Sequence, residues 1–446
     1  METARPVVQP AGPWHRALNH RQWNTLLVAN LGWLFDGYET YALILTVSLS
    51  FHELLPASRQ GSVPFYAGVV IAATLLGWGI GGIVGGVVAD YIGRKGMLIY
   101  AILAYSIVTG FTALAWSWMS FMILRFIVGL ALGSEWSTGT SMVAEMWPEN
   151  HRGKGAGLMQ CGLGIGFFAA SAVWFFVSVL GPSAWRWMYV VGVFPALATW
   201  WIRRGLKEPE KWEASDMKRR EAVAARNRGE ILDDASRQLV RFPLFDLFAN
   251  SATRRLTIAA FLMSTTTTLG WWGISTWVPA YVSSVAAGQG LSGVRWASLA
   301  GMTYNTGAIC GYIGFGFIAD SWGRKPATIA WFALALLMTP VLFLWTHNLV
   351  LLLVVCGMNA VFSLGQYTWC SAWLPEIYPT RIRGTAIGFC FNAPRFVAFL
   401  GPLVAGTLIT YFGGYGKAAV ILSMIYILGI VAAPFLPETR GKSLPD

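Results

Sequence analysis

Five ionisable side chains lie inside long apolar stretches of the chain: Asp36, Glu39, Arg125, Glu135 and Arg395. A charge near the centre of a lipid bilayer costs at least ~2.5–3.5 kcal/mol, so such residues are rare unless they serve a function. A buried carboxyl group can load and release a proton, and an arginine fork can hold a carboxylate by two parallel hydrogen bonds. The chemistry that these residue types predict is therefore proton exchange and anion binding.

Glu39 and Arg125 are predicted to contact each other. Their apolar segments run in opposite directions, and at ~1.5 Å per residue both side chains reach a similar depth in a ~30 Å hydrocarbon core. Protonation of Glu39 would release Arg125, which is how such a pair can couple a proton to movement; the alternative is a purely structural ion pair. Asp36, almost one helical turn before Glu39, either carries the proton itself or is a polar lining residue.

Glu135 and Arg395 each leave two interpretations open. Glu135 lies ~15 Å beyond Arg125 along one helix, so these two are poor partners. It either faces a cavity that opens inward and takes part in proton coupling, or it caps glycine packing. Arg395 follows Asn392 near mid-membrane, and its partner is either a substrate carboxylate or a protein carboxylate such as Glu135.

The elements that position these residues are membrane-spanning helices. The chain has 446 residues, of which 55% are hydrophobic and only 12% are charged. The charges form short islands between apolar runs of ~20 residues, the length that a helix needs to cross a bilayer. The predicted spans begin near Asn24, Phe65, Met97, Met119, Gly155, Ala184, Leu256, Trp296, Ala327, Leu349, Gly384 and Lys417. We therefore expect an all-α membrane protein with twelve transmembrane helices.

Metal, cofactor and nucleic-acid sites are not expected. The five cysteines lie within apolar spans without a CxxC pair, and the five histidines show no metal-ligand spacing. Most of the 32 lysines and arginines fall on one side of the predicted membrane, which indicates that this side is cytoplasmic. The basic charge thus reflects topology. We expect a multi-pass protein of the cell inner membrane, a monomer, with both termini in the cytoplasm.

An internal repeat divides the chain. The segment 86–95 (GVVADYIGRK) recurs as 316–325 (GFIADSWGRK), and 145–153 (EMWPENHRG) recurs as 376–384 (EIYPTRIRG). Two repeated motifs in the same order predict two related six-helix halves, residues 1–204 and 254–446, joined by a partly helical cytoplasmic linker, residues 205–253. The charged repeat residues are predicted to latch the cytoplasmic side: Asp90, Arg94, Lys95, Glu145, Arg152, Asp320, Arg324, Lys325, Glu376 and Arg383.

Aromatic residues at mid-span are candidates for lining a central cavity. With Arg395 and Asn392, the predicted substrate-binding residues are Tyr38, Trp136, Trp271, Trp272 and Tyr367. The alternative for each ring is ordinary core packing, and most of the 23 tryptophans are expected in interfacial belts.

The repeated GxxxDxxGRK loop resembles the hallmark of the major facilitator superfamily. Within it, Arg125 with Gly129, the Glu208–Pro209 pair and the tail PETRGKSL (residues 437–444) resemble the sugar porters. Phe167 and the segment 265–272 (TTTTLGWW) depart from the glutamines with which sugar porters hold their cargo. The segment 35–39 (FDGYE) resembles aromatic-acid:proton symporters, and residues 125–148 are similar to sialate transporters.

This resemblance implies a transporter that works by alternating access, and no arrangement of side chains supports an enzyme. The expected activity is proton-coupled symport of a small organic anion, an aromatic or sugar-derived carboxylate. The alternatives are a proton-coupled sugar or polyol symporter and a non-transporting membrane sensor.

Overall fold

The computed structural model describes residues 13–197 and 205–445, which form helices and turns without a strand. A short 3₁₀ turn, η1 (Trp14–Ala17), precedes the first half. The helices of that half are α1 (His20–Leu54), α2 (Val63–Ile92), α3 (Arg94–Thr112), α4 (Trp118–Met146), α5 (Arg152–Val177) and α6 (Trp185–Val191). Side chains cap the starts of α1 and α4, where Asn19 and Ser117 accept hydrogen bonds from the backbone N–H groups of Gln22 and Ser120.

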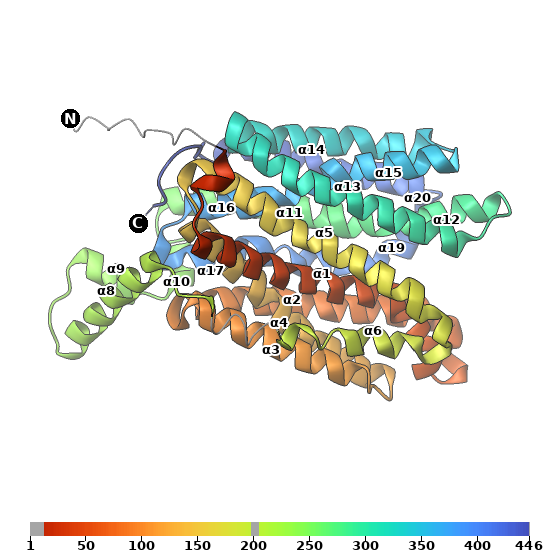
Figure 1. Cartoon of the computed structure of the whole chain (residues 1–446), viewed down its shortest axis with the longest axis horizontal. Helices are drawn as coiled ribbons and strands as arrows, with labels where there is room; N and C mark the ends of the chain where they lie inside the picture. The colour runs from red at the N-terminus through yellow and green to blue at the C-terminus, as the bar shows by residue number, and fades with distance from the viewer. Residues whose placement is uncertain (1–12, 198–204, 446) are drawn as a thin grey trace.

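Three helices form the segment between the halves: α8 (Glu210–Asn227), α9 (Asp234–Val240) and α10 (Pro243–Asp246). They lie at the same end of the bundle as the first and last described residues, to the left in Figure 1. We call this end the linker end and the opposite one the far end. The prediction that this polar segment is partly helical agrees with α8.

The second half repeats the plan with more interruptions. Its helices are α11 (Ser251–Gly273), α12 (Val278–Gly288), α13 (Gly293–Trp322), α14 (Arg324–Pro340), α15 (Leu349–Ser363), α16 (Thr368–Ile377), α17 (Arg383–Asn392), α18 (Arg395–Ala398), α19 (Leu400–Tyr411), α20 (Tyr415–Ser423) and α21 (Ile425–Ala432). Short turns separate α11 from α12 and α15 from α16, and Pro394 lies between α17 and α18. These breaks place irregular backbone in the bundle interior, next to the candidate site.

Seven helical segments in the described ranges are long and apolar enough to cross a membrane by length and composition alone: 57–92, 94–112, 118–146, 149–180, 324–345, 349–377 and 415–435. Four further paths run along the same bundle: α1, α11 with α12, α13, and α17 through α19 (Figure 1). The predicted sixth span begins with α6, and its remainder falls outside the described ranges. The fold is therefore the expected set of twelve transmembrane helices in two six-helix bundles, with helix starts a few residues from the predicted ones.

The halves meet along two pairs of helices. Helix α5 packs against α13, and α2 packs against α17. The repeated motif forms the sharp turns before α3 and α14, where Gly93 and Gly323 have φ values of 99° and 112°, a conformation that suits glycine. These turns bring Asp90 and Asp320 to the linker end, one at each contact between the halves.

Candidate functional site

Glu39 of α1 and Arg125 of α4 form a buried ion pair inside the first half. An Arg125 nitrogen lies 3.1 Å from Glu39 Oε2, and both side chains are at most 1% exposed. Thr109 donates to the same carboxylate oxygen at 2.9 Å, and Arg125 also donates to Thr109 and Thr112. The guanidinium lies 4.8 Å from the ring centre of Tyr189. The predicted contact is thus present, with hydroxyl groups that hold both partners in place.

Asp36 lies on α1 almost one helical turn before Glu39, and Glu135 lies on α4 ten residues beyond Arg125. Glu135 of α4 occupies the notch left by Gly32 of α1, where an added Cβ would lie 1.7 Å from Glu135 Oε1. Gly32 and Asp36 are four residues apart and so share one helix face. Both Asp36 oxygens, Glu135 Oε2 and the Tyr105 hydroxyl are buried, and none of them has a hydrogen-bond partner in the described part of the chain. Glu135 therefore lies against the face of α1 that carries Gly32 and Asp36, and it forms no salt bridge with Arg125 or Arg395.

Arg395 is a buried cation without a carboxylate partner. Arg395 is the first residue of α18. It is 3% exposed, yet it forms no salt bridge among the described residues. One guanidinium nitrogen donates to the Phe391 carbonyl at 2.7 Å, while Nε has no partner. The guanidinium carbon lies 4.6 Å from the ring centre of Trp78 and 4.5 Å from that of Phe391. Aromatic faces therefore flank a positive charge that no carboxylate in the described ranges contacts.

An aromatic cluster from both halves encloses this arginine. Trp136 stacks on Phe391 with ring centres 3.5 Å apart, and Trp33 contacts Trp78, Trp136 and Phe391. Tyr367 packs against Phe391 from α15–α16. The sequence prediction included Trp136 and Tyr367 but missed the other three rings. Helical spacing could have indicated two of them. Trp33 lies three residues before Asp36 and Phe391 lies four residues before Arg395, so each ring shares a helix face with a predicted site residue.

The remaining predicted substrate residues divide into two groups. Trp271 stacks on Phe167 of the other half, and Trp272 lies beside the Glu39–Arg125 pair, so both rings close the space between the halves. Asn392 packs against Gly82 of α2, and its Oδ1 has no partner.

Tyr38 is a correction to the prediction. Its hydroxyl donates to the Met188 carbonyl at 3.0 Å, and its ring packs with Ala42 and Ala170. The side chain therefore belongs to the core of the first half and does not line the space between the halves.

The structure is closed around the site. A cavity of about 10 Å³ reaches Glu39, Arg125 and Trp272, and one of about 20 Å³ lies between Phe167, Trp271 and Tyr304. Each has room for about one water molecule. A small-molecule substrate does not fit into volumes of this size.

The Asp90 cluster joins the halves on one side of the linker end. Asp90 lies 2.6 Å from Arg94 and accepts hydrogen bonds from the backbone N–H groups of Gly384 and Thr385, at the start of α17 in the other half. Arg383 reaches back to Glu145 at 2.8 Å. The carboxylate of Asp90 thus caps a helix of the opposite half.

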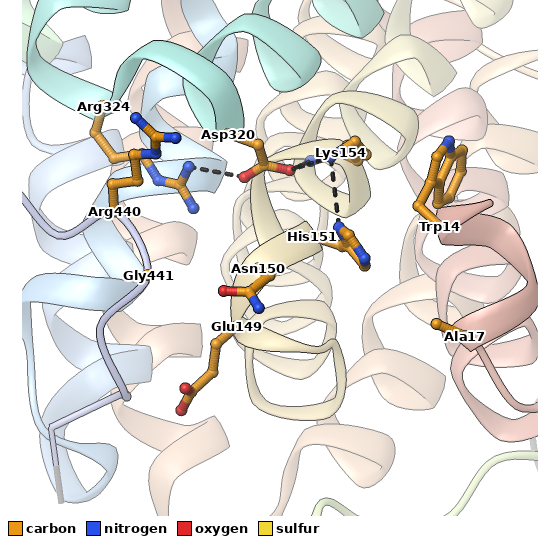
Figure 2. A pocket seen from close by; sticks show the side chains of 10 residues that line it. All are labelled: Trp14, Ala17, Glu149, Asn150, His151, Lys154, Asp320, Arg324, Arg440 and Gly441. Atoms are coloured by element: carbon orange, nitrogen blue, oxygen red, sulfur yellow. Dashed lines mark hydrogen bonds and ion pairs between the residues drawn. The ribbon is translucent and has the colours of Figure 1, made fainter. Parts of the chain in front are cut away.

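The Asp320 cluster repeats this arrangement at the other contact (Figure 2). Asp320 lies 2.8 Å from Arg324 and accepts from the backbone N–H groups of Gly153 and Lys154, at the start of α5. Arg152 lies 3.1 Å from Glu376, which also binds Arg324 at 2.8 Å. The predicted partners Glu145 and Glu376 therefore take part in contacts between the halves.

Lys95 and Lys325 follow Arg94 and Arg324 in the first turns of α3 and α14. Their backbone N–H groups donate to Glu208 and Glu438, and the Lys325 ammonium donates to the Pro434 carbonyl. Glu208 and Glu438 thereby cap α3 and α14, and the sequence prediction did not assign them to the latch. The sequence could have indicated these caps, because a glutamate next to a proline occurs after the last predicted span of each half.

Loss of the Asp90 and Asp320 caps is expected to open the linker end. The Asp90→Asn/Asp320→Asn variant weakens charge-assisted hydrogen bonds to two helix starts, each worth about 1.5–3 kcal/mol. Spin labels at Asn150 and Trp322, exposed positions on the two halves, should report a new population at longer distance once Cys310 is replaced. Glu53→Gln, which breaks a far-end pair with Arg186, is the control. An unchanged distance distribution would show that these carboxylates do not hold the halves together.

Comparisons with known proteins place this arrangement in a family. The family model described as sugar (and other) transporter matches residues 25–446. The cis,cis-muconate transport protein of Acinetobacter baylyi is 29% identical over 420 residues, which cover 93% of this chain and 94% of that protein. The sialic acid transporter NanX of Escherichia coli is 26% identical over 424 residues, 94% of each chain.

Solved structures show the same fold. The proton:xylose symporter XylE of E. coli, a major facilitator superfamily protein, superposes with a TM-score of 0.75 at 21% identity, over 95% of this chain and 98% of that one. The chain thus belongs to the sugar (and other) transporter family, adopts the major facilitator fold, and is a membrane transporter and not an enzyme.

Proposed function

We propose that this protein is a proton-coupled symporter of a small organic anion, an aromatic or sugar-derived carboxylate. The observation that carries the proposal is Arg395 at the contact between the two halves, a buried guanidinium with no carboxylate partner among the described residues. A buried cation without a partner is costly, and a substrate carboxylate supplies the missing charge and the missing acceptors. Arginine also binds such a group in a fixed orientation by a bidentate contact.

The surroundings of Arg395 favour a carboxylate that is attached to a flat or apolar body. Trp33 Nε1, Trp78 Nε1 and Arg395 Nε are buried donors without a partner, so three N–H groups are free to bind an acceptor. The faces of Trp136 and Phe391 offer stacking surface next to them. The cargo names of two relatives, cis,cis-muconate and sialic acid, are both carboxylates and agree with this choice.

Proton coupling is proposed to act through Glu39 and Arg125. While Glu39 is ionised, it holds Arg125 together with Thr109. When Glu39 takes up a proton, the ion pair is lost and the restraint between α1 and α4 weakens. Trp272 of the other half lies beside this pair, so a change there reaches the surface at which the halves part. The empty transporter needs the pair intact, and the loaded one moves with the pair broken.

The proposed orientation places the linker end in the cytoplasm of a bacterial cell, with the protein in the inner membrane as a monomer. Most of the 32 basic residues lie toward that end, in the loops and in the segment of α8–α10. With this orientation, protons that move down their gradient into the cell carry the anion inward with them.

A panel of labelled compounds tests the substrate class. Purified protein in liposomes is loaded with unlabelled compound, and counterflow of benzoate, cis,cis-muconate, sialic acid and xylose is measured. The proposal predicts exchange of at least one acid, which loss of Arg395 reduces, and no exchange of xylose. Exchange of xylose alone would identify a sugar symporter. The absence of exchange with every compound, while thermal stability rises with one of them, would favour a membrane sensor.

A further inference from the structure

A cavity beside the segment between the halves is lined by cations and by no acid among the described residues. Residues 205–253 carry nine basic and nine acidic side chains, so the segment as a whole is neutral. The cavity, of about 410 Å³, lies between α8, α9 and the turn before α17, and its charged lining residues are Lys211, Lys218 and Arg381. The excess of positive charge is therefore local to this cavity and favours an anion as its occupant.

One face of α8 presents two of these cations. Lys211 and Lys218 are seven residues apart, which places them on the same side of the helix with their backbones ~10.5 Å apart. Ala214 and Ser215 lie between them, and these small side chains leave space for a ligand. Both lysines are exposed, and neither forms a salt bridge or a hydrogen bond in the part of the chain that the structure describes. Their ammonium groups are free to bind one ligand together.

The opposite wall of the cavity belongs to the second half. Arg381 lies in the turn η9 (Thr380–Ile382), which leads into α17. Its guanidinium pairs with Asp246 and donates to the Gln238 carbonyl at 3.3 Å. Arg241 lies 3.4 Å from the same Asp246, so one carboxylate serves two arginines. The positive charge of Arg381 is therefore only partly offset.

Helix α8, by contrast, is attached to the first half. Trp212 Nε1 and Arg219 both donate to the Asp90 carbonyl of α2, at 3.2 Å and 2.6 Å. The Arg219 guanidinium also lies 4.7 Å from the ring centre of Tyr91. The cavity thus has one wall fixed to each half, at the linker end to the left in Figure 1. A ligand that contacts both walls joins the halves there.

One lining residue also contacts the Asp90 cluster. The Thr380 carbonyl accepts a hydrogen bond from Arg94 of the first half at 3.4 Å, and the Thr380 hydroxyl accepts one from Arg383 of the second half at 3.0 Å. A ligand in the cavity therefore lies next to the residues that hold the linker end closed.

We propose that this cavity binds a phosphorylated small molecule, which holds the linker end closed and slows transport. A phosphate monoester carries nearly two negative charges at neutral pH and several acceptor oxygens, which suit two free lysines and a partly neutralised arginine better than one carboxylate does. The volume exceeds that of a phosphate ion, and Ala235 and Leu239 of α9 offer an apolar wall to an organic body. Because the ligand needs both walls together, it binds the closed state more tightly and increases its population.

Calorimetry on the purified full chain tests the site with AMP, ribose 5-phosphate and inorganic pyrophosphate, and with adenosine as the compound without phosphate. At least one phosphate compound should bind, and adenosine should not. Lys211→Gln/Lys218→Gln should weaken the binding by roughly tenfold or more. The control Arg226→Gln/Arg228→Gln removes two exposed charges from the other end of α8 and should leave it unchanged.

Three results would overturn the site: no binding, an equal loss in the lysine variant and in its control, or a loss in Arg395→Ala that the lysine variant does not show. The last would assign the ligand to the transport site. Nanodiscs separate a soluble ligand from a lipid headgroup, because phosphatidic acid carries the same phosphate monoester. Binding that persists in phosphatidylcholine but disappears when phosphatidic acid is added would overturn the soluble ligand in favour of the lipid.

Hydrogen–deuterium exchange tests the closing effect without a transport assay. The ligand should slow amide exchange at the starts of α5 and α17, where Asp320 and Asp90 bind backbone N–H groups, in wild type and not in the lysine variant. Unchanged exchange in wild type with ligand bound would overturn the closing effect. If these results are as expected but no acid exchanges in counterflow, the proposed function fails and the phosphate site stands.

Discussion

Glu39→Gln should abolish accumulation against a gradient and spare exchange at equilibrium. The glutamine resembles protonated Glu39, so Arg125 is released permanently, and the loaded transporter can still move. The empty transporter must return with the pair re-formed, and removal of one partner from a buried ion pair costs about 3–5 kcal/mol. A cost of this size in the return step slows it by roughly 100- to 1,000-fold or more. Net uptake and counterflow of the same labelled acid, measured side by side, separate the two steps.

The matched control for this experiment is Glu53→Gln. Glu53 pairs with Arg186 at the far end with side chains 32% and 28% exposed, so its loss should leave both fluxes unchanged. Asp36→Asn tests whether the proton enters through the neighbouring acid instead. Concentrative uptake that persists in Glu39→Gln, in Asp36→Asn and in the double variant would remove helix α1 from the coupling mechanism.

Arg395→Lys should weaken carboxylate binding by about 2–5 kcal/mol, a loss of roughly 30-fold or more. The lysine keeps the charge, but its ammonium cannot provide two parallel hydrogen bonds or lie flat between Trp78 and Phe391. Binding to purified protein by isothermal calorimetry measures the change. Arg383→Lys is not a suitable control, because that residue holds Glu145 in the latch. Arg295→Lys, on the exposed surface at the far end, is the matched one.

A double-mutant cycle decides whether the arginine and the substrate carboxylate meet. Wild type and Arg395→Ala are each measured with benzoate and benzamide, or with another acid that exchanges and its amide. Direct contact predicts that the amide loses little further affinity once Arg395 is gone. Strictly additive losses would leave Arg395 as a structural residue and would favour a neutral substrate.

The depth of a residue could be predicted from the sequence, but its direction around the helix could not. Glu39 and Arg125 were placed at one level by their distance from the helix starts, and they meet there. Tyr38 lies at nearly the same level but ~100° further round α1, and it points to Met188 inside the first half. The approach of Glu135 to the α1 face that carries Asp36 depends on the notch at Gly32, which only the packing of α1 on α4 reveals.

The contacts at the linker end were predictable in part because the repeat supplied them twice. The order of Asp90, Arg94 and Glu145 recurs in the second half, and opposite charges at one membrane face have few other partners. The caps provided by Glu208 and Glu438 were missed because these carboxylates bind backbone N–H groups. Every residue except proline has such a group, so the sequence does not show which ones a glutamate will bind. The rings of Trp78 and Phe391 were missed for another reason. Arg395 was expected to contact a carboxylate, whereas its guanidinium packs against these two aromatic rings.

The most direct test of the central claim is proton movement driven by substrate alone. Liposomes that contain the protein and an internal pH-sensitive dye, without an imposed pH gradient or membrane potential, receive an inward gradient of an acid that exchanges in counterflow. Proton-coupled symport predicts that the lumen acidifies in wild type and does not in Glu39→Gln, with Glu53→Gln behaving as wild type. Entry of the labelled acid without acidification in wild type would contradict the account.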